Sequence, residues 1–135
     1  MNNNQNQNSN LKMQTDKEKF KKDFIRRLIA FSLGIIRFCD KVREKRTFWS
    51  IVDQLIRSAT SIGANVIEAK SSSSKKDYLH FFEIALKSAN ETKYWLILVK
   101  EGIPELREEA EKLLQEANEI SNILGSSILT LKGKK

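Results

Sequence analysis

One stretch of the chain carries a long helical seam that limits the fold more than any other feature. Between residues 78 and 99, apolar and small residues recur at steps of 4-3-4-3-4-3. They are Tyr78, Phe82, Ala85, Ala89, Thr92, Leu96 and Val99. That spacing keeps one face of a helix against its neighbours and is typical of an antiparallel bundle. Because the 135 residues include one proline and five glycines, long helices are favoured over a turn-rich β protein.

Three further segments repeat this periodicity, so the sequence predicts four helices at about 16–46, 49–70, 75–101 and 105–131. Ser74 and Asp77 resemble a capping box that starts the third helix. Gly102 and Pro104 are the expected stop signals at its end. The connections are short, which makes successive helices antiparallel. We therefore predict an all-α, up-down-up-down four-helix bundle that forms a single domain over residues 16–131.

The two ends of the chain lack this pattern. Residues 1–15 include the stretch NNNQNQNSN and are predicted to be a disordered Asn/Gln-rich tail, and residues 132–135 a flexible basic tail. No secretory signal is visible. The uncharged, apolar run of residues 28–36 is too short to span a bilayer. We expect a cytoplasmic protein with no membrane partner.

Residues 58–71, SATSIGANVIEAKS, combine small residues with a Lys-Ser pair in a way that resembles a phosphate-binding loop. Aligned on Lys70, however, that motif would need glycines where the chain has Ala64 and Ala69. The stretch is interpreted instead as the end of a helix. Together with the start of the next helix, it supplies the predicted structural residues, which are Ala59, Gly63, Asn65, Glu68, Ser74 and Asp77.

Each of these residues has an expected packing role. Ala59 and Gly63 are small and lie four apart on one face, where a neighbouring helix can approach closely. Asn65 and Glu68 share a face near the helix end. We expect Asn65 to hydrogen-bond across to the start of the third helix, around residues 74–77.

No catalytic or metal-binding constellation is found. His80 is the single histidine and Cys39 the single cysteine, which is too few for a zinc set. Cys39 is interpreted as a core thiol and His80 as an ordinary, partly exposed residue. A carboxylate site built from Glu68 and Glu83 is conceivable, but nothing in the pattern marks it. We expect a non-enzymatic protein without a cofactor or a metal.

The surplus of positive charge lies in or just before the first predicted helix. Residues 11–46 hold 12 Lys and Arg against 5 Asp and Glu, whereas residues 47–135 hold 12 of each. The basic residues form one cluster at the start of this helix and another at its end. Nine of them are candidate nucleic-acid-binding residues: Lys19, Lys22, Arg26, Arg27, Arg37, Lys41, Arg43, Lys45 and Arg46.

Two interpretations of these clusters stay open. They can follow a nucleic-acid backbone with salt-dependent, sequence-independent affinity. Alternatively they can pair with the fourth predicted helix, which is rich in glutamate, in the same subunit or in a neighbour. The second interpretation makes the protein an interaction scaffold with no direct nucleic-acid contact. Phe48 and Trp49, next to Arg46, are one exception to a general lack of base-stacking aromatics, although we expect the turn to bury them.

Two bands are apolar on every side of their helices, at residues 28–36 and 94–99. A bundle helix needs only one apolar stripe, so the remaining surface requires cover from outside. This predicts that the chain associates with itself.

The stretches LIRSATSIGANVIEA (residues 55–69) and SKKDYLHFFEIALKSANETKYWL (residues 74–96) resemble the bacterial family encoded within intervening sequences of 23S ribosomal RNA genes. Asn65, Glu68, Ser74, Lys75 and Lys76 match its motif positions. The family often has Gly after the Glu where this chain has Ala69, so its second helix is expected to continue slightly further. The close match covers about a third of the chain.

The resemblance implies a four-helix bundle that assembles into a homopentameric ring. It also points to a related protein, the accessory variability determinant of diversity-generating retroelements, which is a basic pentamer that binds nucleic acid and a reverse transcriptase. RNA or DNA, a reverse transcriptase or another protein, and further copies of the chain are accordingly the partners it implies. No enzymatic activity is established for the family.

Overall fold

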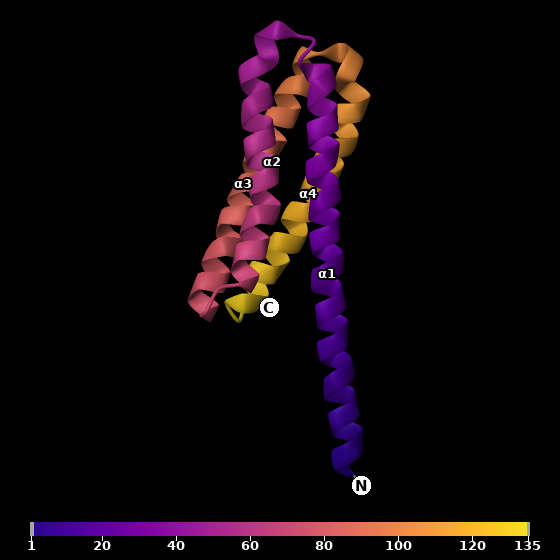
Figure 1. The fold of residues 1–135 in the computed structure, drawn as a ribbon, viewed down its shortest axis with the longest axis vertical. Coiled ribbons are helices and arrows are strands. Elements are labelled where there is room, and N and C mark those ends of the chain that lie inside the picture. Colours follow the sequence, from indigo (N-terminus) through magenta and orange to yellow (C-terminus); the bar gives the residue numbers. More distant parts are fainter. Residues whose placement is uncertain (1, 135) are drawn as a thin grey trace.

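The computed structural model describes residues 2–134, with side chains from residue 5 onward, and this part of the chain contains helices and no strand. The four long helices are α1 (Asn2–Val42), α2 (Trp49–Lys70), α3 (Lys75–Gly102) and α4 (Arg107–Leu131). Two short 3-10 helices, η1 (Arg46–Phe48) and η2 (Pro104–Leu106), precede α2 and α4. Successive long helices run in opposite directions (Figure 1). The predicted all-α, up-down-up-down architecture is confirmed.

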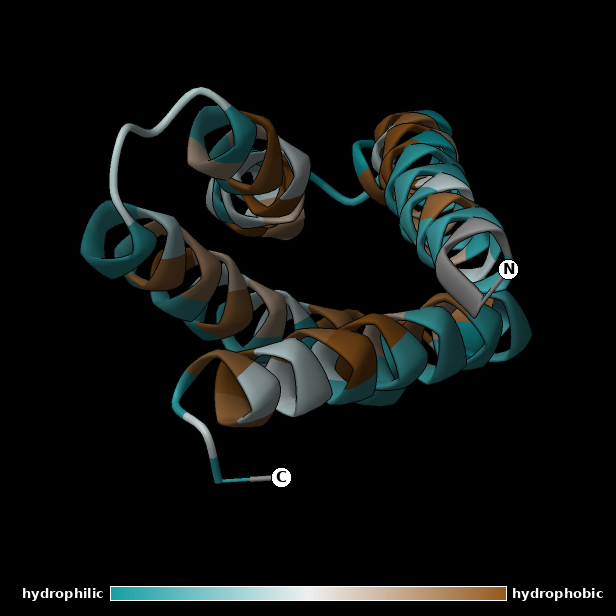
Figure 2. Ribbon diagram, turned by 90° about the horizontal axis from the view of Figure 1, so that it is seen from below, coloured by the Kyte–Doolittle hydropathy of each residue, from teal (hydrophilic) through white to brown (hydrophobic). Residues whose placement is uncertain are grey.

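The helices surround one apolar core, with α1 and α3 at diagonal corners and α2 and α4 between them (Figure 2). The predicted apolar faces supply this core. Its largest fully buried residues include Leu28, Ile35, Leu55, Ile62, Leu96, Ile120 and Leu124. Burial of these side chains is the main stabilising contribution, at about 1.5–3 kcal/mol for each.

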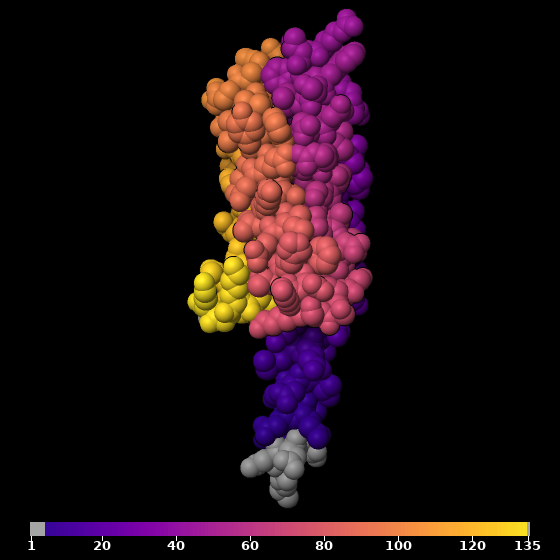
Figure 3. All heavy atoms as spheres, turned by 90° about the vertical axis from the view of Figure 1, so that its left-hand side faces the viewer, coloured from indigo at the N-terminus to yellow at the C-terminus, as the bar shows by residue number. Residues whose placement is uncertain are grey.

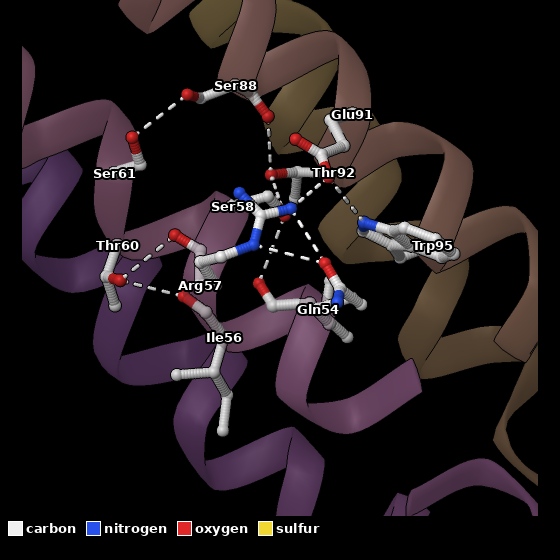
Figure 4. Close-up of polar contacts among 11 residues, drawn as sticks. Gln54, Ile56, Arg57, Ser58, Thr60, Ser61, Ser88, Glu91, Thr92 and Trp95 are labelled. Carbon is white, nitrogen blue, oxygen red and sulfur yellow. Dashed lines mark hydrogen bonds and ion pairs between the residues drawn. The ribbon is translucent and has the colours of Figure 1, made fainter. Parts of the chain in front are cut away.

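Small hydroxyl residues pack α2 closely against α3 (Figure 4). The Thr92 hydroxyl, fully buried, lies 2.9 Å from Ser58 Oγ and 2.8 Å from the Ser88 carbonyl. One turn away, Ser88 Oγ and Ser61 Oγ lie 3.0 Å apart. Because buried hydroxyls need partners, these pairs favour a single register between the two helices.

The first connection begins earlier than predicted. α1 ends at Val42 rather than Arg46, because Lys45 has an extended backbone at φ −97° and ψ 100°. The ring of Phe48, half-buried, lies against Gly102, where a Cβ would come within 2.5 Å of its Cζ. Trp49 was expected to be buried but is 52% exposed, since it starts α2 on the outer side of this turn.

At the other end of the molecule, α1 extends well past the bundle (Figures 1 and 3). It begins at Asn2, so residues 2–15, predicted to be disordered, are helical in the structure. Side chains 5–23 are all exposed, so the helix continues there mainly through its local backbone hydrogen bonds. In the predicted C-terminal tail, Gly133 has a positive φ of 70°, and Lys135 lies outside the described residues. No helix in residues 2–134 is both long and apolar enough to cross a membrane.

The predicted structural residues divide into confirmed and corrected roles. Ser74 caps α3 as expected, because its Oγ accepts a hydrogen bond from the Asp77 backbone N–H at 3.1 Å. Ala59 is buried. Gly63 faces Leu28 of α1, where an added Cβ would lie 3.5 Å from the Leu28 Cβ. That is an ordinary contact, so the space there would also accept a methyl group.

The expected role of Asn65 is wrong. Its amide donates within its own helix, to the Ser61 carbonyl at 2.8 Å and to Ser61 Oγ at 3.0 Å, rather than across to α3. A partner one helical turn away satisfies the side chain without a tertiary contact. Glu68 on the next turn is exposed to solvent.

Candidate nucleic-acid interface

Three of the nine candidate basic residues pair with α4 or with η2, which precedes it. Arg27 donates to Glu116 through Nε at 2.8 Å and Nη2 at 2.6 Å, and it also contacts Glu119. Near the end of α1, Lys41 Nζ lies 2.6 Å from Glu109 Oε1. In the connection after α1, Lys45 Nζ lies 3.7 Å from Glu105 Oε2 of η2. These ion pairs neutralise the side of α1 that faces the first half of α4.

The pair between Arg27 and Glu116 is the strongest of these contacts. Its two parallel N–H···O bonds have the fork geometry that suits a guanidinium and a carboxylate. Hydrogen bonding to Arg27 lowers the pKa of Glu116, and the same bonds raise the pKa of Arg27. Both side chains are only about one-third exposed. The pair is therefore a structural contact and leaves Arg27 little free charge for a ligand.

Three other candidates contact residues close in sequence. Arg26 lies 3.9 Å from Asp23, and Arg43 lies 3.1 Å from Asp40, each on its own exposed helix face. The Arg46 guanidinium lies 5.4 Å from the centre of the Trp49 ring, a cation–π contact. Such exposed contacts contribute little to stability and can exchange for a stronger anion.

Lys19, Lys22 and Arg37 are the candidates with neither an ion pair nor a hydrogen bond among the described side chains, and all three are exposed. Lys19 and Lys22 have unpaired neighbours along the first part of α1, namely Lys12 and Lys17. The lysines in the first part of α1 lack partners on α4 because α4 has no carboxylate after Glu119. The fourth helix therefore cannot neutralise the start of α1.

A second set of lysines, which sequence reasoning did not select as a ligand site, lies at the same end of the bundle. Lys70 and Lys75 flank the connection between α2 and α3, and together with Lys17 and Lys21 of α1 they line one cleft. We call this surface the basic end. It consists of Lys12, Lys17, Lys19, Lys21, Lys22, Lys70, Lys75 and Lys76.

The signal for the second set was present in the sequence. In an up-down bundle the start of the first helix lies at the same end as the connection between the second and third helices. Lys75 and Lys76 also belong to the motif on which the family resemblance rests. Residues 17–21 and 70–75 are far apart along the chain, however, so they do not form one cluster in the sequence. Only the antiparallel arrangement brings them to one surface.

The residues considered for catalysis or metal binding lie on three different helices. Cys39 is buried, and burial raises the pKa of its thiol to about 11, which suppresses its reactivity. His80 is exposed. Glu83 is exposed and lies 3.9 Å from Lys132, while Glu68 is on α2. Within residues 2–134 no group of three His, Cys, Asp or Glu side chains has a metal-binding arrangement.

The fold and surface define a class: an all-helical, four-helix-bundle protein with a basic end. The family described as 23S rRNA-intervening sequence protein matches residues 20–126. The chain therefore belongs to this family, as the resemblance of residues 55–96 predicted.

A solved structure gives a consistent comparison. The crystal structure of a protein with unknown function from the S23 ribosomal protein family, from Bacteroides thetaiotaomicron VPI-5482, is 33% identical to this chain. The alignment covers 78% of this chain and 97% of that one, with a TM-score of 0.73. Among curated proteins, no match is found. The fold is thus shared with a relative whose own function is unknown.

Proposed function

We propose that this chain is a non-enzymatic, homo-oligomeric accessory protein that binds the backbone of RNA or DNA. The observation that carries the proposal is the basic end, where eight exposed lysines from two separate segments lie at or beyond one end of the bundle and have no carboxylate partner on α4. Clustered cations of this kind release counterions from a phosphate backbone, which gives affinity without base readout.

The basic residues preferred as phosphate contacts are not all those that the charge distribution along the sequence suggests. Arg27 and Lys41 are engaged with α4 and Lys45 with η2, so they contribute less than the start of α1. Lys19 and Lys22, which are exposed and unpaired among the described side chains, are the preferred contacts on α1. Several subunits in one assembly would repeat this surface and multiply the local field.

The exposed apolar residues support the oligomeric part of the proposal. Ile29, Leu33 and Ile36 form a stripe on α1 and are 39–52% exposed. On α3, at the opposite corner of the bundle, Tyr94 and Ile97 are 55% and 43% exposed. Two different apolar faces on opposite sides suit a head-to-tail contact, which closes into a ring when the rotation permits. The pentamer implied by the family resemblance is an assembly of this kind.

The nucleic-acid proposal is tested by fluorescence anisotropy with a labelled 20-nucleotide RNA and a DNA duplex across a series of salt concentrations. Affinity should fall steeply with salt. The double variant Lys19→Glu/Lys22→Glu should lower affinity by at least about tenfold and flatten the salt dependence by about 0.7 per lost contact on single strands. Lys112→Glu, an exposed residue in the first half of α4, is the matched control and should change little. Absence of binding at low salt would reject the proposal.

The oligomeric part has its own test. Light scattering should give a mass several times the 15.6 kDa of the chain, and Leu33→Glu should reduce it. Leu129→Glu places the same charge on a comparably exposed leucine of α4 and serves as the control. A monomer at micromolar concentration would contradict self-association.

The alternative function is a protein-interaction scaffold without nucleic-acid contact. It is favoured by the pairing of Arg27, Lys41 and Lys45 with glutamates of α4 and η2, which uses part of the basic surface inside the molecule. A pulldown that retains the same protein partner after nuclease treatment, from a chain that shows no salt-dependent RNA binding, would select this alternative.

A further inference from the structure

The bundle is closed along one half of the α1/α4 seam and open along the other. In the closed half, Gly34 of α1 lies against Leu113, with 3.7 Å between its added Cβ and the leucine Cδ2, and ion pairs join the helices on both sides of this contact. In the open half, residues 16–24 of α1 and residues 122–131 of α4 instead form opposite walls of a cleft. A four-helix bundle normally packs each helix against two neighbours.

The cleft has a volume of about 1080 Å³ and opens to solvent. That is at or above the upper end of typical small-molecule sites, which are about 300–1,000 Å³. Its walls extend along α1 and α4 for about 12–14 Å, taking 1.5 Å for each helical residue, or between two and three turns. These dimensions correspond to a short helical segment.

The floor of the cleft is apolar and built from three helices, α1, α2 and α3. Phe24, Val66 and Phe82, each 4–6% exposed, lie at its base, and Phe20, 57% exposed, lies on the α1 wall. Phe20 stacks on Phe24 with 6.4 Å between ring centres. A surface of this kind suits apolar side chains that repeat every three or four residues.

The rim of the cleft is positively charged. Lys17, Lys21, Lys70 and Lys75 line it, against the single carboxylate of Asp16. Lys21 Nζ lies 5.7 Å from the centre of the Tyr78 ring, which holds this cation at the opening. An occupant with carboxylates beside its apolar stripe would be complementary to both the floor and the rim.

We propose that this cleft binds an acidic amphipathic α-helix of a partner protein, two to three turns long. The partner helix lies between the start of α1 and the end of α4, with its apolar side chains on Phe20, Phe24 and Phe82 and its Asp and Glu residues beside the rim lysines. This is helix-in-groove recognition. It shares the rim lysines of the basic end with the proposed backbone binding, whose preferred contacts on α1, Lys19 and Lys22, lie outside the cleft lining.

The charged rim and the apolar floor favour this occupant over two others, a second copy of the first part of α1 and nucleotide bases. The exposed first part of α1 carries lysines, so a second copy of that segment would bring like charges together at the rim. Nucleotide bases need polar partners at their edges, whereas the residues at the base of the cleft are phenylalanine, valine and alanine. The other polar lining residues come from the connection between α2 and α3 and from the α4 wall, which includes the Asn122 amide. On that wall, Ser127 is bonded back to the Ile123 carbonyl at 2.9 Å and Thr130 to the Ser126 carbonyl at 3.1 Å.

The test starts with a selection from a random library of 16-residue peptides against the immobilised full-length chain. Affinities of the enriched peptides are then measured by fluorescence anisotropy. Enriched sequences should carry more Asp and Glu than Lys and Arg, and apolar residues at steps of three and four. Binding should weaken at least about tenfold with Phe20→Glu, because a carboxylate would then face the apolar side of the peptide.

Matched controls separate the cleft from general charge effects. Leu11→Glu introduces the same charge on α1 at a residue 61% exposed outside the cleft, and it should leave affinity unchanged. The rim is tested by Lys21→Glu/Lys75→Glu, with Lys87→Glu on the exposed surface of α3 as its control. Ser127→Glu on the α4 wall is a second cleft variant, and circular dichroism checks that each protein is folded.

Several results would overturn the proposal. One is a peptide pool without acidic bias, and another is equal binding to the chain with Phe20→Glu. Enriched sequences that match a segment of this chain would assign the cleft to a second copy. Failure to enrich peptides, combined with loss of oligothymidine binding in Phe20→Glu but not in Leu11→Glu, would assign it to nucleotide bases. Loss of salt-dependent RNA binding in Lys19→Glu/Lys22→Glu concerns the backbone proposal alone.

Discussion

The α2/α3 seam and the α1/α4 seam belong to the same bundle but are held by different chemistry. Ser58, Ser61, Ser88 and Thr92 are small, so α2 and α3 approach closely along a row of buried hydroxyl contacts. The α1/α4 seam relies on long ion pairs such as Arg27 with Glu116, and it opens where the glutamates of α4 end. All four helices of this bundle have the same apolar periodicity, so periodicity does not explain the difference. The seams close where small side chains or charge pairs join the helices, and they open where both are missing.

Thiol labelling should give the largest contrast between the closed and open regions. Cys39 has a pKa of about 11 because burial disfavours its thiolate, so at pH 8 it should react about a hundredfold more slowly than an ordinary thiol. A second thiol introduced by Ser127→Cys on the wall of the cleft should react at the ordinary rate. Stopped-flow labelling of this two-thiol variant should therefore show two phases. A single fast phase would mean that the core around Cys39 is open.

Enlarging one residue in each seam should have opposite consequences for stability. Thr92→Leu overpacks a fully buried position and removes the hydroxyl contact with Ser58, which should cost about 1–3 kcal/mol of unfolding free energy. Ser127→Leu adds the same side chain in the open half, where there is room, and should stay within about 0.5 kcal/mol of wild type. Urea unfolding measures both. Equal costs would remove the distinction between the seams.

The ion pair of the closed half predicts a pH dependence. Because hydrogen bonding to Arg27 lowers the pKa of Glu116 below its usual 4.5, this carboxylate stabilises the fold above about pH 4.5. The contribution is lost as the pH falls through the lowered value. Glu116→Gln should therefore cost about 1 kcal/mol at pH 7, a figure that allows for solvent screening, and much less near pH 3.

The control for this pH effect is Glu108→Gln, an exposed glutamate in the first turn of α4. It should alter stability little at either pH. If the cost of Glu116→Gln stayed the same from pH 7 to pH 3, the ion pair would not be the cause of the closed half.

Replacing glycines by alanine should have the smallest effect. Gly63→Ala places a methyl in ordinary contact with Leu28, and it should raise the unfolding free energy by about 0.5–1 kcal/mol because alanine is the better helix former. Gly102→Ala is the opposing case, since its Cβ would lie 2.5 Å from Phe48 Cζ and must displace that ring. Thermal unfolding of both variants distinguishes them. A loss at Gly63 would show that the α1/α2 contact is tighter than an ordinary one.

Most of the bundle could be predicted from the chain because helix formation is local. The 4-3 spacing from Tyr78 to Val99 and the Ser74 cap placed α3 within a residue of its observed bounds, Lys75–Gly102. The bounds of α2, Trp49–Lys70, were predicted correctly. The end of α1 was missed because basic residues at 43–46 are compatible with both a last helical turn and a connection. The partner of Asn65 was missed because a side chain of this kind can bond locally or across helices.

What the sequence by itself determined is the class of fold, the family and the uneven charge of the chain, because each depends on residue spacing and composition. The tertiary structure alone decided which cations remain available. It paired Arg27 and Lys41 with α4 and Lys45 with η2. It also brought Lys17 and Lys21 beside Lys70 and Lys75, some 50 residues away along the chain. Charge neutralisation and cleft formation depend on distances between helices, and those distances are set only when the whole bundle packs.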